Sequence, residues 1–495
     1  MRESGILMPV FSLPSEYGIG CFSKQAYEFV DFLRKSGQKK WQILPLGPTG
    51  YGDSPYQSFS TFAGNPYFID IETLAEEGLL TESECRESMP EDAGKIDYEW
   101  LYAHRFPLLK KAFIRFQKEK KEREALAYQK FVKDNKEWLP DYCLFMAIKD
   151  REGGVSYTKW RPELRDREPK ALERAGKDLA QETEFYTFLQ YEFRKQWDKL
   201  HAYANKNGIE IVGDIPIYVA ADSADTWANP GLFQMDENNF PIRVAGCPPD
   251  AFSADGQLWG NPLFDWEYHK ETGYKWWLSR IAHCFRLYDV VRIDHFRGFD
   301  EYYAIPYGDK TAEFGEWMPG PGMDLFRAVK EKLGDLNIIA EDLGFLTDSV
   351  KELLEDSGYP GMKVLQFAFD PREPGNYLPH TYSTNCVVYT GTHDNTTTRG
   401  WYHEISAESR AFAREYMQVP ALDEDTLCWN FIALAMSSVA RLCMIPMQDY
   451  LCLDKEARIN TPSTLGGNWT WRMSADALSS GLAEKIRRMT LVYGR

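Results

Sequence analysis

Residues 288–295 read Tyr288-Asp289-Val290-Val291-Arg292-Ile293-Asp294-His295, a short apolar run that ends on an acid and a histidine. Its length and its β-branched residues are typical of a buried strand in a parallel sheet. Seven further runs of this kind occupy residues 5–10, 41–46, 209–214, 337–341, 363–370, 386–392 and 442–448. Helical patterns lie between many of them. Eight strands that alternate with helices predict an α/β fold of the TIM (β/α)8 barrel type.

Two intervals between these runs are too long to be ordinary connections. The middle of the first interval, residues 99–200, is charged and has helical patterns. Because the strand series resumes after it, we expect a mainly helical subdomain inserted between strands 2 and 3 of the barrel. The second interval, residues 215–287, is rich in Gly, Pro and Asn, which indicates a loop-rich insertion after strand 3. We therefore expect residues 1–495 to form a single catalytic barrel with these insertions.

The composition and the charge exclude several classes of protein. Aromatic residues make up 15% of the 495 residues, too much apolar surface for a disordered chain. The net charge of −17 opposes nucleic-acid binding, because it repels phosphate from most of the surface. The nine cysteines are scattered without a C-x-x-C pair, which is typical of reduced thiols. Since we find no signal peptide and no run of about 20 apolar residues, we expect a cytoplasmic protein that contacts no membrane.

Acidic residues stand where four of the predicted strands end. These ends carry Asp214, Asp294-His295, Glu341-Asp342 and His393-Asp394-Asn395. In a parallel barrel the C-terminal strand ends meet at one mouth, so we expect these side chains to converge. A single acid after a strand is often only a helix cap. Four converging acids with histidine and arginine beside them make capping alone a poor explanation.

A ring of carboxylates suits two kinds of chemistry. One is a divalent metal site with oxygen ligands, suitable for Mg²⁺ or Mn²⁺. The other is glycosyl transfer, which needs an ionised carboxylate as nucleophile and a protonated carboxyl as acid. Arg292 lies two positions before Asp294 on the same side of the strand, so its charge favours the ionised aspartate. Burial and neighbouring carboxylates are expected to raise the pKa of Glu341, as an acid requires.

Two loops at the predicted mouth mix aromatic side chains with amide, hydroxyl and carboxylate groups. They are residues 51–58, after the second strand, and residues 255–262, in the long interval after the third. Aromatic faces pack against the apolar face of a pyranose, and polar groups bind its hydroxyls. An isolated tyrosine or tryptophan is more often a core residue. The position of Tyr51, Tyr56 and Trp259 in these loops favours a sugar ligand.

At these residues the sequence resembles the 4-α-glucanotransferases of the amylomaltase, or disproportionating enzyme, family, which is related to the α-amylase clan. The resemblance runs over nearly the whole chain. Its motifs are at residues 4–15, 54–57, 213–216, 292–298, 340–344, 392–395 and 467–469. Each motif is weak alone, but their order is specific, with 47 residues from Asp294 to Glu341 and 53 from Glu341 to Asp394.

The resemblance implies a role for each matching residue. Asp294 matches the nucleophile, Glu341 the general acid/base and Asp394 the transition-state stabiliser. The positions that match substrate contacts are Tyr51, Ser54, Tyr56, Asp214, Gln257, Trp259, Arg292, His295, His393 and Asn468. The resemblance implies no metal and no cofactor. The C-terminal β-sandwich domain usual in α-amylases is not expected, since only 47 residues follow residue 448.

The implied activity is transfer of a segment of an α-1,4-glucan to the 4-hydroxyl of glucose or of another glucan, with retention through a covalent intermediate. The partners would be maltooligosaccharides, amylose or other α-1,4-glucans, with glucose as an acceptor, and the protein a monomer or weak homodimer. The main alternative is an α-1,4-glucan hydrolase of the α-amylase type. A metal-dependent barrel enzyme and a non-catalytic glucan-binding protein are further alternatives.

Overall fold

Eight parallel strands form the centre of the computed structural model, which describes residues 2–50, 52–90, 94–119, 122–249, 254–344, 346–372, 375, 377–419, 424–464 and 466–495. The strands are β1 (Glu3–Leu7), β2 (Lys40–Gln42), β3 (Glu210–Pro216), β6 (Val290–Asp294), β9 (Ile338–Ala340), β10 (Gly361–Val364), β11 (Cys386–Tyr389) and β12 (Leu442–Pro446). Their order is β10-β11-β12-β1-β2-β3-β6-β9. The Ala340 N–H donates to the Pro360 carbonyl at 3.0 Å, which brings the two ends of the sheet together. The predicted TIM barrel is confirmed.

The strands alternate between two apolar environments. Residues on one side fill the barrel interior, among them Val212, Val290 and Ile339. Residues on the other side, such as Ile211 and Ile293, join the larger core under the surrounding helices. Because side chains alternate along a strand, residues two positions after the interior ones also face inward. This alternation directs the side chains at positions 214, 292, 294 and 341 to the mouth of the barrel.

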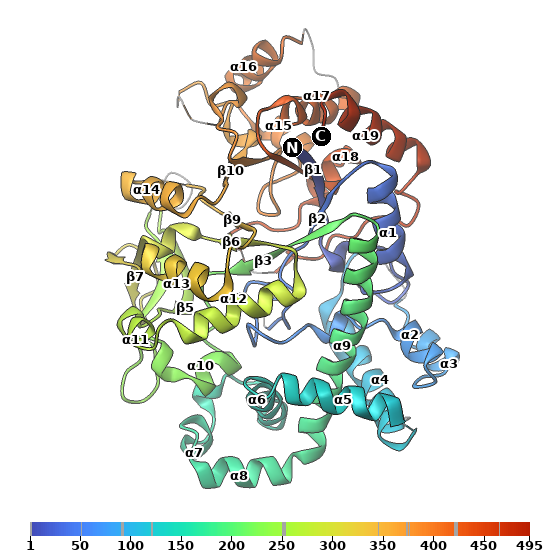
Figure 1. Cartoon of the computed structure of the whole chain (residues 1–495), viewed down its shortest axis with the longest axis vertical. Helices are drawn as coiled ribbons and strands as arrows, with labels where there is room; N and C mark the ends of the chain where they lie inside the picture. Colours follow the sequence, from blue (N-terminus) through green and yellow to red (C-terminus); the bar gives the residue numbers. More distant parts are fainter. Residues whose placement is uncertain are drawn as a thin grey trace.

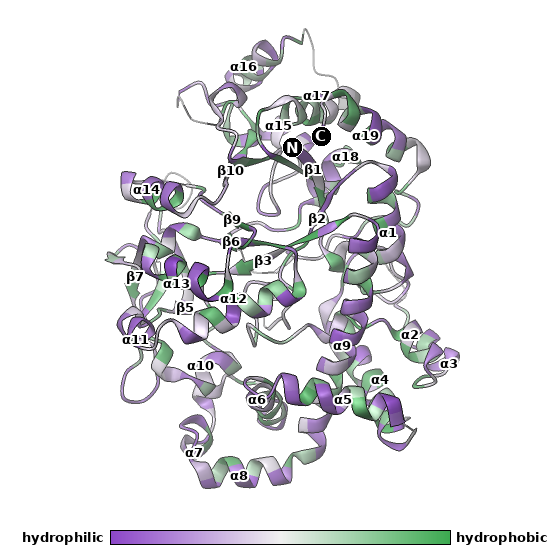
Figure 2. Cartoon of the chain, viewed as in Figure 1, coloured by the Kyte–Doolittle hydropathy of each residue, from purple (hydrophilic) through white to green (hydrophobic). Residues whose placement is uncertain are grey.

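Amphipathic helices cover the outside of the barrel (Figures 1 and 2). Helix α1 (Lys24–Lys35) buries Ala26, Phe29, Val30 and Leu33, a spacing that places one apolar stripe against the strands. The other helices around the barrel and at its C-terminal side are α12 (Lys275–Leu287), α13 (Met323–Leu333), α14 (Asp348–Ser357), α15 (Thr398–Glu404), α16 (Ala407–Met417), α17 (Glu424–Ser437), α18 (Met447–Tyr450) and α19 (Ser480–Val492). No helix in the described part of the chain is both long enough and apolar enough to span a bilayer.

Helices also occupy most of the interval between β2 and β3. They are α2 (Ile71–Glu76), α3 (Glu82–Arg86), α4 (Tyr98–Glu119), α5 (Glu122–Asp134), α6 (Leu139–Arg151), α7 (Pro162–Arg165), α8 (Pro169–Asp178) and α9 (Ala180–Lys206). In Figure 1, α6, α7 and α8 lie below the barrel, and α9 runs back up beside α1. Gln190 of α9 bonds both the N–H and the carbonyl of Gly64, at 2.7 and 2.8 Å. The inserted helices therefore brace the segment that follows β2.

A second, antiparallel sheet lies beside the barrel. Its strands are β4 (Arg243–Cys247), β5 (Gln257–Pro262), β7 (Glu301–Pro306) and β8 (Glu316–Pro319), in the order β5-β4-β7-β8. The sequence analysis expects a loop-rich insertion over 215–287, and within this interval the structure has β4, β5 and the helices α10 (Ala224–Ala228), α11 (Trp266–Glu271) and α12. The partner strand β7 follows β6, far along the chain, and the β4–β5 register shifts between Val244 and Gly246. Neither the pairing with a distant strand nor the register shift produces a local alternation of apolar and polar residues that would predict these strands.

Candidate active site

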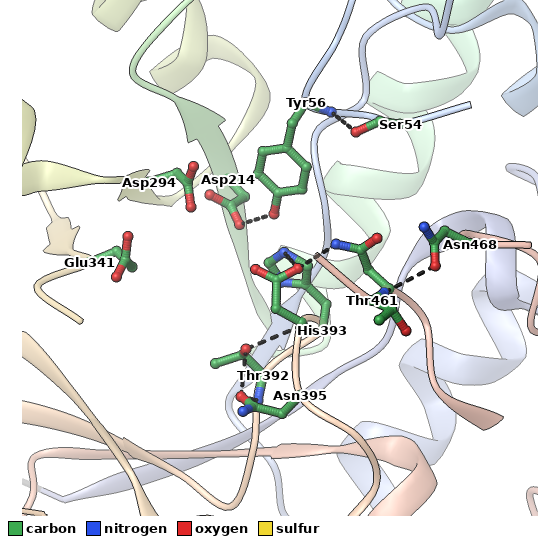
Figure 3. A network of polar contacts seen from close by, with 12 residues as sticks. Ser54, Tyr56, Asp214, Asp294, Glu341, Thr392, His393, Asn395, Thr461 and Asn468 are labelled. Atoms are coloured by element: carbon green, nitrogen blue, oxygen red, sulfur yellow. Dashed lines mark hydrogen bonds and ion pairs between the residues drawn. The ribbon is translucent and has the colours of Figure 1, made fainter. Parts of the chain in front are cut away.

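A buried guanidinium holds two of the predicted acids together at the barrel mouth. Arg292 Nη1 lies 2.8 and 2.7 Å from the two carboxylate oxygens of Asp214, and 3.1 Å from Asp294 Oδ1. Its Nε donates to the Met362 sulfur at 3.4 Å. The Tyr56 hydroxyl donates to Asp214 Oδ2 at 2.8 Å. Figure 3 shows Tyr56, Asp214 and Asp294 grouped at this mouth, so residues from the loop after β2, from β3 and from β6 meet there.

The Glu341 carboxylate is held by backbone amides. It accepts the N–H of His295 at 2.7 Å and the N–H of Leu343 at 2.8 Å. His295 directly follows β6 and adopts a left-handed backbone conformation with a φ of 53°. Such a conformation is uncommon for a residue other than glycine and is frequent at functional sites. The turn at His295 therefore links the end of β6 to the acid that follows β9.

The pKa values of Asp294 and Glu341 are both raised above their ordinary values. Burial is the largest cause for each. The charges of Glu341 and Asp214 raise the pKa of Asp294 further, while Arg292 lowers it. At Glu341, Arg292 and the two amide hydrogen bonds lower the pKa. Because the charge of Glu341 is one of the causes that raise the pKa of Asp294, the ionisation of Asp294 depends on that of Glu341.

The effect of Arg292 on Asp294 has the expected direction, because the guanidinium lowers the pKa of Asp294. Burial and the charges of neighbouring carboxylates outweigh that effect, so the pKa is raised well above its usual range. The guanidinium makes its two shortest contacts with Asp214, which is completely buried, and these contacts neutralise much of its charge. Asp294 receives a single, longer contact, and 28% of its side chain stays exposed. Arg292 thus holds Asp294 through one contact, and its charge does not bring the pKa of Asp294 back to the usual range.

Asp394 lies on the other side of the mouth, in the segment that follows β11. Its Oδ1 accepts the Asn460 amide at 2.6 Å and lies 3.4 Å from His393 Nε2. Arg458 donates to the Asp394 carbonyl at 2.6 Å and to the Asn460 carbonyl at 2.7 Å. The sequence analysis missed Arg458 and Asn460. They come from a segment more than 60 residues further on, and neither was predicted as a site residue.

The two predicted histidines are neutral and packed against aromatic rings. Burial lowers the pKa of His393, and it lowers that of His295 to about 4. The His393 ring stacks on Tyr56 with a centroid distance of 5.1 Å, and Trp259 meets His295 edge-on at 4.8 Å. A neutral imidazole offers one donor and one acceptor nitrogen. Both histidines therefore suit the hydroxyl groups of an uncharged ligand.

Two of the predicted contact residues, Gln257 and Trp259, lie on strand β5 and are bonded to each other. The Trp259 indole N–H donates to Gln257 Oε1 at 3.1 Å. Gln57 belongs to the loop after β2. It donates to Asn261 Oδ1 at 3.1 Å and so connects that loop to strand β5. Gln57 and Asn261 lie within the sequence motifs but were not singled out as site residues. The two aromatic loops are therefore joined, as a shared binding surface requires.

The remaining predicted contacts differ in their surroundings. Ser54 Oγ accepts the Tyr56 N–H at 3.2 Å and so shapes the turn that carries Tyr56. Asn468 bonds Thr461 and Thr464 within its own loop and not the four acids (Figure 3). Tyr51 lies outside the described residues. Among the residues that the structure describes, no group of three or more His, Cys, Asp and Glu side chains has an arrangement that could hold a metal ion.

The fold and these groups define a class of protein: a (β/α)8-barrel enzyme whose carboxyl groups gather at the C-terminal ends of the strands. A model of one family, 4-alpha-glucanotransferase, matches residues 8–478. The chain belongs to this 4-alpha-glucanotransferase family. The membership confirms the resemblance found in the motifs, and the hydrolase alternative is not favoured.

Individual relatives agree with the family model. The chain is 48% identical over 491 residues to the 4-alpha-glucanotransferase of Clostridium butyricum, covering 99% of this chain and 100% of that one. It is 50% identical over 497 residues to that of Streptococcus pneumoniae serotype 4, covering 100% and 97%. The solved amylomaltase of Streptococcus agalactiae, in complex with acarbose, is 41% identical and superposes with a TM-score of 0.97 over 100% of both chains.

Proposed function

We propose that the chain transfers a segment of an α-1,4-glucan to the 4-hydroxyl of glucose or of another α-1,4-glucan, by a double displacement that retains the anomeric configuration. One observation carries this proposal. The Asp294 carboxyl, oriented by Arg292, ends strand β6, and the Glu341 carboxyl, held by two backbone amides, directly follows the neighbouring strand β9. A carboxylate nucleophile and a protonated carboxyl acid at neighbouring strand ends are what the first step requires.

In the first displacement, Asp294 Oδ attacks the anomeric carbon of the donor while Glu341 gives its proton to the leaving glycosidic oxygen. The fragment carrying the reducing end departs with a new 4-hydroxyl. A covalent glycosyl ester of Asp294 remains, and Glu341 is then ionised. Its two amide bonds stabilise that charge, because hydrogen bonds to the charged form favour it. The negative charge thus passes from Asp294 to Glu341, and the net charge of the two groups does not change.

In the second displacement, Glu341 removes the proton from the 4-hydroxyl of an acceptor sugar. The acceptor oxygen attacks the anomeric carbon from the face that the first fragment left, and the Asp294 carboxylate departs. The Asp394 carboxylate, oriented by Asn460, faces the positive charge that develops on the sugar ring in both steps. Glu341 ends protonated, so the site returns to its starting state.

The preference for transfer over hydrolysis depends on holding an acceptor sugar better than water. Tyr56 and Trp259 place aromatic rings against the neutral histidines of the mouth, and such rings pack on pyranose faces. The solved amylomaltase of S. agalactiae contains acarbose, which supports a carbohydrate ligand for this mouth. We infer that maltooligosaccharides, amylose and similar glucans are donors and that glucose is an acceptor.

Incubation with maltotriose tests the proposal. Transfer produces glucose together with a ladder of longer chains, while the number of reducing ends stays constant. Chromatography of the products and a reducing-end assay on the same samples measure both quantities. A rise in reducing ends without longer chains would overturn the proposal in favour of a hydrolase.

A further inference from the structure

The segment that carries His393 and Asp394, residues 390–398, has both of its ends bonded to one carboxylate. The segment joins β11 to α15, and the carboxylate belongs to Asp449 of α18. At one end the Thr390 hydroxyl donates to Asp449 Oδ2. At the other end Thr398 donates its N–H to Oδ1 at 2.8 Å and its hydroxyl to Oδ2 at 2.7 Å. Asp449 therefore spans the base of the whole segment.

These three side chains are buried in the protein. Asp449 is 1% exposed, and Thr390 and Thr398 are completely buried. None of them lies where a sugar could touch it. In the interior, hydrogen bonds are stronger than in water and no solvent replaces a lost partner. Burial raises the pKa of Asp449, and the bonds from Thr390 and Thr398 oppose that rise. The contacts of Asp449 thus favour its charged form and hold its two threonine partners in place.

Between its two ends, the segment is held by hydrogen bonds from two amide side chains, one inside the segment and one outside it. Asn395 Oδ1 accepts both the N–H and the hydroxyl of Thr392 at 2.9 Å, as Figure 3 shows. Gln366 donates to the Thr396 carbonyl at 2.9 Å. The Gln366 side chain also lies close to Gly391. A Cβ atom on residue 391 would lie 2.7 Å from the amide nitrogen of Gln366. A braced segment moves as a unit, so its anchor sets the position of the groups it carries.

We propose that Asp449 is a positioning residue for glycosyl transfer, which fixes both ends of segment 390–398 and so sets His393 and Asp394 against Asp294. The inference rests on the proposed function. Asp449 follows β12, the strand paired with β11, so the anchor is built on the barrel wall. An error of about 1 Å in the placement of a catalytic group can cost about 100-fold in rate. Losing the anchor should therefore reduce catalysis more than folding.

Asp449→Ala tests the role, with acarbose binding measured by calorimetry alongside maltotriose kinetics. The stoichiometry of binding counts folded sites, and the dissociation constant reports the site itself. We expect full stoichiometry, an acarbose Kd raised about tenfold and a kcat lowered about tenfold or more. Asp449→Asn should recover part of the activity, because one amide oxygen can still accept the Thr398 N–H and the threonine hydroxyls can rotate to accept from the amide.

Two further variants keep the experiment decisive. If Asp449→Ala does not fold, Thr390→Val removes one anchor at nearly constant shape, and we expect kcat to fall about threefold or more at full stoichiometry. The matched control is Asp70→Asn, which should stay within about twofold of the wild type, because Asp70 is also buried and also accepts the N–H and the hydroxyl of a threonine, Thr73, but bonds no residue of segment 390–398.

Two results would overturn the inference. One is a folded variant without the anchor whose kcat and acarbose Kd match the wild type. The other is a reduced stoichiometry with an unchanged Kd, which would show a purely structural role. If the wild type itself forms no ladder from maltotriose, the proposed function fails, and this inference fails with it.

Discussion

Arg292 and Asp214 form a fully buried ion pair in which one guanidinium nitrogen lies within 2.8 Å of both carboxylate oxygens. Arg292 contacts Asp294 only once, at 3.1 Å. The ion pair with Asp214 therefore leaves less of the positive charge of Arg292 to act on Asp294. Asp214 also accepts the Tyr56 hydroxyl. Burial is the largest cause of the raised pKa of Asp294, and the charge of Asp214 adds to it although an arginine contacts Asp294.

Removing the charge of Asp214 should therefore change the pH profile of the enzyme. In Asp214→Asn, Arg292 retains only Asp294 and Glu341 as nearby carboxyl groups that it attracts, so the pKa of Asp294 falls. The acid limb of kcat/KM, below which Asp294 is protonated, moves to lower pH. The measurement is kcat/KM for maltotriose between about pH 4 and about pH 8.

The control for this prediction is Tyr56→Phe, which removes a hydrogen bond to Asp214 and leaves every charge in place. Its acid limb should stay where the wild-type limb lies. A limb that moves in Tyr56→Phe, or that stays fixed in Asp214→Asn, would contradict the role given to the Arg292–Asp214 pair.

The orientation of Asp394 gives a second prediction. Asn460 donates a 2.6 Å hydrogen bond to its carboxylate, and one such charge-assisted bond contributes about 1.5–3 kcal/mol. In Asn460→Ala we expect kcat to fall by about 10- to 100-fold, because the lost group orients a charge that matters most in the transition state. Asn385→Ala is the matched control, since Asn385 bonds Gly358 and Arg441 and no predicted site residue. Equal kcat losses in both variants would count against a specific role.

A third prediction concerns stability in the helical insertion. Glu192 of α9 is completely buried, and its pKa is raised to about 7, mainly by burial, while Lys195 opposes the rise. A raised folded-state pKa stabilises the protein below the unfolded pKa of about 4.5, and the contribution is lost as the pH rises through about 7. In Glu192→Gln the free energy of unfolding should therefore fall less between about pH 5 and about pH 8 than in the wild type.

Urea unfolding at both pH values measures this difference. Glu124→Gln is the control, because Glu124 also contacts Lys195 but has a lowered pKa. Its change of unfolding free energy over the same range should not be smaller than that of the wild type. A Glu192→Gln variant with the wild-type pH dependence would exclude Glu192 as the titrating group.

The sequence predicts the barrel because its signal is local. Each strand is a short apolar run, as at Tyr288–Asp294, and each acid stands directly at a strand end, as Glu341 does after β9. The same reasoning fails where partners are distant. Strand β4 pairs with β7, which is distant in the sequence. Asp394 accepts a hydrogen bond from Asn460, which lies 66 residues further along the chain.

The raised pKa of Asp294 could not be predicted from the sequence for the same reason. The sequence shows that Arg292 lies two positions before Asp294. It does not show that Asp214, 78 residues before Arg292, also binds the guanidinium, because that contact forms only in the folded chain. Local patterns therefore identify which residues form the site, and the packed structure decides how their charges are shared.

The central claim is that Asp294 forms a covalent bond to the sugar, and trapping that intermediate tests it most directly. In Glu341→Gln, a donor such as α-maltotriosyl fluoride needs no proton for its leaving group, so the first step proceeds and the second, which needs a base, is slowed by about 100-fold or more. Mass spectrometry of proteolytic peptides should then find one maltotriosyl group on the peptide that contains Asp294. The label on another residue, or turnover of the fluoride in Asp294→Asn at the rate of the wild type, would contradict the account.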